Sequence, residues 1–192
     1  RRILSAGIDA LGPQAGAALT AFSVLGREFR SGAALCLIGE GAPAAISSLC
    51  KRGMLVDLGE ERQERRYLFA HALLQEVAYG VLLKRDKCAL HASVAEYLET
   101  RLQQDGFDPA RLSELAWHYS RAEKPENAWP PYYRAGVKAA EDWLLAFAAE
   151  QLRHAREGFE RCQWATGIDG IGPGGSHLKN PLEGGETIVN AA

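Results

Sequence analysis

The chain has 192 residues, which is enough for one ordinary domain or two small ones with a real hydrophobic core. Hydrophobic residues make up 47% of the chain and charged residues 24%, as in an ordinary soluble globular protein. The formal net charge of −2 provides no overall field that would attract nucleic acid or a membrane surface. Composition therefore excludes charge-driven binding by the chain as a whole and leaves only a local patch.

Cysteine spacing and the lengths of the apolar runs indicate the cellular compartment of the protein. The four cysteines, at positions 36, 50, 88 and 162, are too far apart for a CxxC metal or redox pair, and we expect buried free thiols in a reducing cytosol. We identify no apolar run close to the ~20 residues that cross a bilayer, and no signal peptide. The sequence thus predicts a cytoplasmic protein that does not contact a membrane. Because position 1 is not Met, we also expect the chain to be cut from something longer.

Three short helices are predicted near the N-terminus. They cover residues 13–26, 31–41 and 43–52. Pro13 suits a first helical turn, and Gly26 ends the first apolar run. Ser31 can cap the second helix, and cations followed by Gly53 end the third.

The pattern then changes to that of a hairpin. Residues 54–58 and 67–69 are typical of two short strands around a charged hairpin at residues 59–66. Three helices followed by a two-stranded hairpin is the element order of a winged helix.

Amphipathic helices are predicted from Ala70 onward. Breaks are expected at residues 106–109, where Asp108 can cap the next helix, and at residues 125–131. The pair Pro130 and Pro131 removes two helical donors and should displace or kink the helix start there. Short antiparallel helices with small residues at their contacts indicate a helical-repeat array.

We therefore expect a mainly α fold, with a winged-helix module carrying a small two-stranded hairpin, followed by antiparallel tetratricopeptide-like repeats. The predicted boundaries are residues 1–85 for the winged-helix module, 86–163 for the helical hairpins and 164–192 for a tail. The tail holds 7 of the 20 glycines and is expected to be disordered.

The sequence lacks the common nucleotide-binding, metal-binding and catalytic motifs. There is no Gly-Lys dipeptide and hence no P-loop, no HExxH zinc motif and no GxSxG nucleophile elbow. Residues 170–175 satisfy GxGxxG, but no predicted strand precedes them and no helix follows. We expect His118 to be packed or half-exposed, and His91 and His154 to lie on polar helix faces. The chain is therefore predicted to hold no catalytic site, no metal and no cofactor.

One run of the sequence carries a family resemblance. Residues 67–79 read Tyr-Leu-Phe-Ala-His-Ala-Leu-Leu-Gln-Glu-Val-Ala-Tyr. This run resembles the region that follows the ATPase core in bacterial STAND-type signal-transduction ATPases, which are attached to adenylate or guanylate cyclase domains or to LuxR-type DNA-binding domains. Residues 24–29, 90–98 and 132–136 match the same family in the same order. The match covers about residues 8–160, but the family's P-loop is absent and the glycine-rich tail replaces its further repeats.

The resemblance implies a role for His71. In that family the winged helix folds back on the ATPase module, and a histidine at this position helps to sense the phosphates of bound ATP or ADP. The residues permit such a role, since His71 follows a strand and stands at a helix N-terminus, where free backbone donors favour an anion. The alternative is that His71 only caps or packs the first turn.

The leading hypothesis is a non-catalytic regulatory fragment. It would couple the nucleotide state of an upstream ATPase domain of the same polypeptide to a helical platform that binds a protein or small-molecule effector. The alternative is a DNA-binding winged-helix regulator, but its recognition helix at residues 43–52 offers mainly Ala, Ser and Cys, and the arginines at residues 59–66 are offset by glutamates. A third hypothesis, an enzyme in its own right, lacks any group of catalytic residues that converge in sequence.

Overall fold

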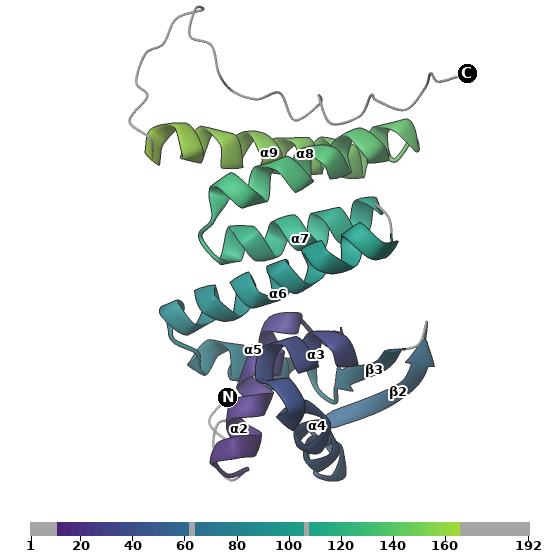
Figure 1. Cartoon of the computed structure of the whole chain (residues 1–192), viewed down its shortest axis with the longest axis vertical. Coiled ribbons are helices and arrows are strands. Elements are labelled where there is room, and N and C mark those ends of the chain that lie inside the picture. Colours follow the sequence, from purple (N-terminus) through teal and green to yellow (C-terminus); the bar gives the residue numbers. More distant parts are fainter. Residues whose placement is uncertain (1–10, 62–63, 106–107, 166–192) are drawn as a thin grey trace, which may run out of the picture.

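The computed structural model describes residues 11–61, 64–105 and 108–165. Within these residues the chain is mainly helical, with one small antiparallel sheet near the N-terminal end (Figure 1). Its elements are α2 (Pro13–Phe22), η1 (Ser23–Leu25), β1 (Glu28–Arg30), α3 (Ser31–Ile38), η2 (Gly39–Gly41), α4 (Ala42–Lys51), β2 (Leu55–Glu61), β3 (Glu64–Phe69), α5 (Ala72–Val81), α6 (Lys84–Asp105), α7 (Pro109–Arg121), α8 (Pro125–Glu141) and α9 (Leu145–Ala165).

The N-terminal half forms the predicted winged-helix module. Helices α2, α3 and α4 precede the β2–β3 hairpin, and the strand order is β1-β3-β2. The sheet has three strands rather than the two expected, because β1 pairs antiparallel with β3 and places Phe29 opposite Tyr67. A strand of three residues is too short to show a period-2 alternation, so its sequence gave no signal.

The hairpin strands are also longer than predicted. Strands β2 and β3 extend into the charged segment at residues 59–66 that was expected to form a loop. Cross-strand ion pairs account for this, since Arg65 lies 2.6 Å from Asp57 and Arg66 lies 3.3 Å from Glu61. Both are diagonal pairs, since Asp57 faces Tyr67 and Glu61 faces Glu64 in the register. Opposite charges at diagonal positions of antiparallel strands attract each other.

The module's core is built from aromatic and aliphatic side chains of the helices and the sheet. Phe22 and Phe69 are fully buried, and Phe29 lies between them with ring centroids 5.3 Å and 6.0 Å away. The other core members include Leu19, Leu49, Leu55 and Leu74. Leu74 belongs to α5, so this helix is part of the winged-helix core.

The stretch Ser31–Lys51 has the length and mean hydropathy, 1.5, of a membrane span, so the expectation that no such run exists is wrong on composition alone. In the structure the stretch is divided into α3, η2 and α4, and Gly39 ends α3 with a φ of 65°. Its apolar residues Ala34, Ile46 and Leu49 are buried in the winged-helix core. This arrangement is compatible with a soluble protein.

Helices α6 to α9 follow the winged helix as a stack in which each helix packs on the next (Figure 1). Asp108 accepts a hydrogen bond from the Ala110 backbone N–H at 3.2 Å, which confirms the predicted cap of α7. The close contacts use small residues, because a Cβ on Gly136 of α8 would lie only 2.7 Å from Cγ of Leu152 on α9. The predicted antiparallel helical hairpins are confirmed.

The break predicted at residues 125–131 is wrong. Helix α8 begins at Pro125 and runs through Pro130 and Pro131. Two backbone donors are lost there, but Pro131 and Tyr132 are buried against neighbouring helices. Tertiary packing therefore outweighs the missing hydrogen bonds.

Two other expectations concern the thiols and the chain ends. Cys36 is exposed and the other three cysteines are partly exposed, so the prediction of buried thiols is wrong. The predicted boundary after residue 85 falls in the first turn of α6. Of the tail predicted at 164–192, all but the last two residues of α9 lie outside the described residues.

Candidate functional site

His71 stands where the chain passes from β3 into α5. The backbone N–H of Ala70 donates to the Met54 carbonyl at 3.0 Å, which fixes the end of the strand. His71 then adopts an extended conformation as the N-cap of α5, and its carbonyl accepts from the N–H of Leu74 at 3.0 Å. Its side chain makes no capping hydrogen bond and is exposed. His71 therefore caps the first turn through its backbone carbonyl and not through its side chain.

The N-terminus of α5 can accept a negatively charged group. The first N–H groups of an α-helix lack intrahelical partners and lie at the positive end of the helix dipole. At this end Ala72 is exposed, and Leu73 retains 42% of its accessible surface. An imidazole beside exposed backbone donors could donate a hydrogen bond to a phosphate oxygen.

The rest of α5 is held firmly in the winged-helix core. Gln75 donates from Nε2 to the Ser23 carbonyl at 2.7 Å, and Leu74 and Ala78 are buried. The exposed end at His71 is thus attached to a helix whose opposite face cannot move independently of the module.

The C-terminal part of α5 contacts the first repeat helices through a chain of polar groups, which we call the histidine chain: the half-buried Tyr79 and the buried His91 and His118. The Tyr79 hydroxyl lies 3.0 Å from Nε2 of His91, and Nδ1 of His91 lies 3.0 Å from Nδ1 of His118. Both imidazoles are essentially without solvent exposure, at 0% and 2%. The chain therefore joins α5, α6 and α7.

Both imidazoles are neutral at physiological pH. Burial, and then the nearby charges of Arg121 and Lys87, lower the pKa of His91 from 6.5 to about 4. Burial, and then His91, lowers the pKa of His118 to about 3. In a neutral pair one Nδ1 carries the proton and the other accepts it, so the chain of hydrogen bonds runs in one direction.

The sequence prediction for these histidines was partly wrong. His118 is packed, as expected, but His91 does not lie on a polar face, because α7 covers it and Trp117 packs edge-on against its ring at 5.1 Å. The residues are 27 positions apart, and no spacing motif links them. A usable signal did exist, since His91 precedes the buried Val94 and Ala95 by three and four residues on the same helix face.

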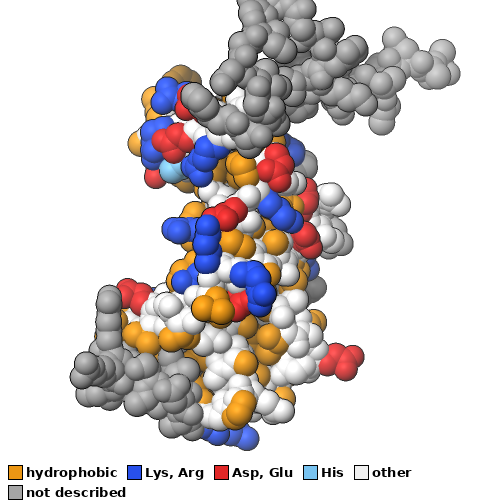
Figure 2. Space-filling model, turned by 90° about the vertical axis from the view of Figure 1, so that its left-hand side faces the viewer, with side chains coloured by type: hydrophobic (Ala, Val, Ile, Leu, Met, Phe, Trp, Pro, Cys, Tyr) orange, Lys and Arg blue, Asp and Glu red, His pale blue; other side chains and the backbone are white. Residues whose placement is uncertain are grey.

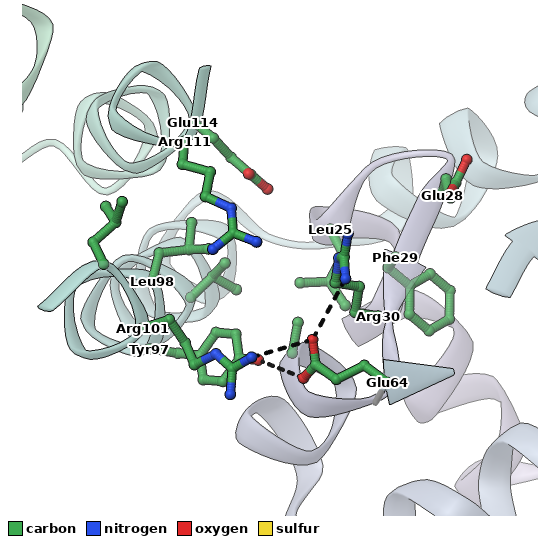
Figure 3. A pocket seen from close by; sticks show the side chains of 13 residues that line it. Leu25, Glu28, Phe29, Arg30, Glu64, Tyr97, Leu98, Arg101, Arg111 and Glu114 are labelled. Atoms are coloured by element: carbon green, nitrogen blue, oxygen red, sulfur yellow. Dashed lines mark hydrogen bonds and ion pairs between the residues drawn. The ribbon is translucent and has the colours of Figure 1, made fainter. Parts of the chain in front are cut away.

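A second contact between the modules is charged, and we call it the Glu64 cluster: Arg30, Glu64, Tyr97 and Arg101 (Figure 3). The Tyr97 hydroxyl donates to Oε1 of Glu64 at 3.1 Å, while Arg101 and Arg30 lie 3.6 Å and 3.8 Å from Oε2. Burial, and then the Glu64 carboxylate, raises the pKa of Tyr97 to about 12. The cluster connects β1 and β3 of the winged helix to α6.

Within the described residues, no group of three or more His, Cys, Asp or Glu side chains is placed to hold a metal ion. No protein-family model, curated protein or solved structure gives a match to the chain.

Proposed function

We propose that the chain is a non-catalytic regulatory part of a signalling ATPase. Helix α5 would couple the nucleotide state of an upstream ATPase domain to a helical platform that binds a protein or small-molecule effector. One observation carries the proposal: the same helix presents the exposed His71 at its start and holds the inter-module contact of Tyr79 near its end. The sequence resemblance supplies the expectation of an ATPase domain.

The coupling rests on helix geometry. His71 and Tyr79 are eight positions apart, which corresponds to about 12 Å along a helix. An α-helix held by backbone hydrogen bonds moves as a unit over this length, so a shift imposed at His71 displaces the Tyr79 hydroxyl. Tyr79 in turn contacts His91 of α6, and α6 begins the repeat stack.

The proposal assigns the nucleotide to the partner domain. ATP or ADP would be bound by the upstream ATPase domain, and His71 would contact its phosphates only when that domain docks on α5. The protein would act in the cytoplasm, with the effector bound by helices α6 to α9.

Two substitutions in the full-length protein test separate halves of the proposal. His71→Ala should weaken ADP retention, because it removes a donor to the phosphates. Tyr79→Phe should leave ADP retention unchanged but alter the output activity, because it breaks only the contact with His91. Nucleotide release measured with a fluorescent ADP analogue separates the two effects.

The control is Lys51→Ala at the exposed end of α4, which lies outside both α5 and the proposed effector platform and should change neither quantity. Unchanged nucleotide retention and output in the His71→Ala protein would refute the sensor role.

The alternative of DNA binding receives little support. Helix α4, at the recognition-helix position, exposes Pro43, Ala44, Ser47 and Lys51, which offer few groups for reading base edges. Two arginines of the wing are engaged with carboxylates, Arg65 with Asp57 at 2.6 Å and Arg66 with Glu28 at 2.9 Å. On the face shown in Figure 2, acidic and basic side chains are interspersed over the repeats.

A further inference from the structure

A cleft of about 200 Å³ lies between the winged-helix module and helices α6 and α7. Its walls combine apolar side chains with three arginines from three different elements: Arg30 from β1, Arg101 from α6 and Arg111 from α7. Three carboxylates also line it, those of Glu28, Glu64 and Glu114. In Figure 3, Arg30 and Arg111 extend toward each other from opposite sides of this space. No part of the proposed coupling through α5 uses the cleft.

The guanidinium of Arg30 carries N–H donors that no described side chain accepts. Its guanidinium lies 3.7 Å from Glu61 and 3.8 Å from Glu64, which is beyond hydrogen-bond distance from both. Among the described residues it donates no side-chain hydrogen bond, although a guanidinium carries five N–H donors in a planar fork. A planar fork of this kind matches a carboxylate or phosphate with two parallel hydrogen bonds.

The apolar part of the cleft sets a second requirement. Leu25, Leu98 and Leu102 line it beside the arginines. Ligand pockets for drug-sized molecules typically occupy about 300–1,000 Å³, so this cleft fits only a smaller molecule. The combination of a guanidinium fork and a short apolar wall selects a small amphipathic anion.

We propose that this cleft binds a small organic anion, with a carboxylate or phosphate head on Arg30 and a short apolar body on Leu25 and Leu98. A ligand seated there contacts β1 of the winged helix and α6 of the repeats together, so it regulates the junction of the two modules. The inference does not depend on the proposed ATPase partner, and its test needs neither that domain nor a nucleotide.

The test is a titration of the purified chain at constant ionic strength, read by calorimetry and by the rise in unfolding temperature that ligand binding produces. The probes are acetate, propionate and butyrate for the carboxylate head, and butyl phosphate for the phosphate head. Saturable binding with one site is expected, and each added methylene should tighten it roughly fourfold. The tighter of butyrate and butyl phosphate identifies the head group. Butanol and butylamine, which lack an anionic head, should not bind.

Substitutions locate the site. Arg30→Gln should weaken binding of the tighter anion by about 10- to 100-fold, because hydrogen bonds to a charged group are lost, and Arg30→Lys should have an intermediate effect. Leu98→Ala should reduce the dependence on chain length without abolishing binding. The matched control is Arg156→Gln on α9, where the exposed Arg156 pairs with Glu160.

Equal affinity in the wild-type and Arg30→Gln proteins would overturn the proposal. So would the absence of saturable binding of every anionic probe, or a response to butylamine equal to that of butyrate. If Arg30→Gln lowers the unfolding temperature so far that titration fails, Arg30→Lys and Leu98→Ala test the site instead. Wild-type affinity in Arg30→Lys together with an unchanged dependence on chain length in Leu98→Ala would then overturn the proposal.

Discussion

Two of the contacts that join the winged-helix module to the helical repeats differ in their chemistry. The histidine chain is neutral and both of its imidazoles are buried, with its three groups linked at 3.0 Å. The Glu64 cluster is charged and lies at the rim of a cleft, with ion-pair distances of 3.6 Å and 3.8 Å. Salt screens exposed charges but hardly affects buried neutral hydrogen bonds. The first contact therefore fixes the junction, while ions or a bound anion can adjust the second.

The largest effect is expected from breaking the histidine chain with His91→Ala. This change removes a fully buried ring and leaves the Tyr79 hydroxyl and Nδ1 of His118 without their partner. We expect a loss of about 2–4 kcal/mol in the free energy of unfolding, from the cavity and the unpaired groups together. Urea denaturation followed by circular dichroism measures it.

The control for this change is His154→Ala on α9, where the ring is partly exposed. It should cost less than about 1 kcal/mol. Equal losses in the two variants would show that the histidine chain contributes nothing specific to the junction.

The next effect is a loss of stability in mild acid. Because the folded state holds the pKa of His91 at about 4 while the unfolded chain has 6.5, the unfolded state binds more protons between these values. Stability is therefore complete above pH 6.5 and falls as the pH drops toward 4. For His91 alone the loss is on the order of 3 kcal/mol. Urea denaturation at a series of pH values measures it.

The variant His91→Phe keeps a ring in the cavity and removes this titration. Its stability should fall less steeply over the same pH window than that of the wild type. Identical slopes would assign the acid sensitivity to carboxylates elsewhere in the chain.

Crowding the Glu64 cluster should have a smaller effect. A Cβ on Gly32 would collide with Oε1 of Glu64 and the Tyr97 hydroxyl, so Gly32→Ala must displace their hydrogen bond. We expect a loss of about 1 kcal/mol, the typical net value of one hydrogen bond, because the atoms that must move are the ends of two side chains. Thermal unfolding of this variant measures the loss.

The matched control is Gly80→Ala in α5, where an added Cβ meets no atom within 4 Å. The gain in helix propensity should make it neutral or stabilising by up to about 1 kcal/mol. If both alanine variants behave alike, the space around Gly32 is not as restricted as the structure indicates.

The sequence was informative where a local rule determines the structure. Asp108 was predicted as a helix cap because an Asx side chain before a proline-led helix can accept from the first turn, and it does so. His71 was placed correctly at a strand-to-helix junction for the same kind of reason. In both cases the determining residues are within a few positions of each other.

The failures concern features that depend on distant residues. Strand β1 exists because β3 pairs with it, and α8 continues through Pro130 because other helices pack on it. His91 and His118 meet only after α6 and α7 are packed together. Tertiary contacts of this kind override local propensity and are not encoded in any short pattern.

The smallest effect is expected from Glu64→Gln, and it tests the comparison most directly. The amide oxygen can still accept from Tyr97, so only the attraction to Arg30 and Arg101 is lost. We expect a cost below about 1 kcal/mol at low salt, which should vanish as salt screens the wild-type ion pairs. The cost of His91→Ala should stay constant over the same salt range, because the ring is fully buried and its hydrogen bonds link neutral groups. Urea denaturation of both variants at low and high sodium chloride measures the difference, with Glu141→Gln at the exposed end of α8 as the control. A salt-independent cost at Glu64 would mean that its hydrogen bond to Tyr97, rather than its charge, holds the second contact together.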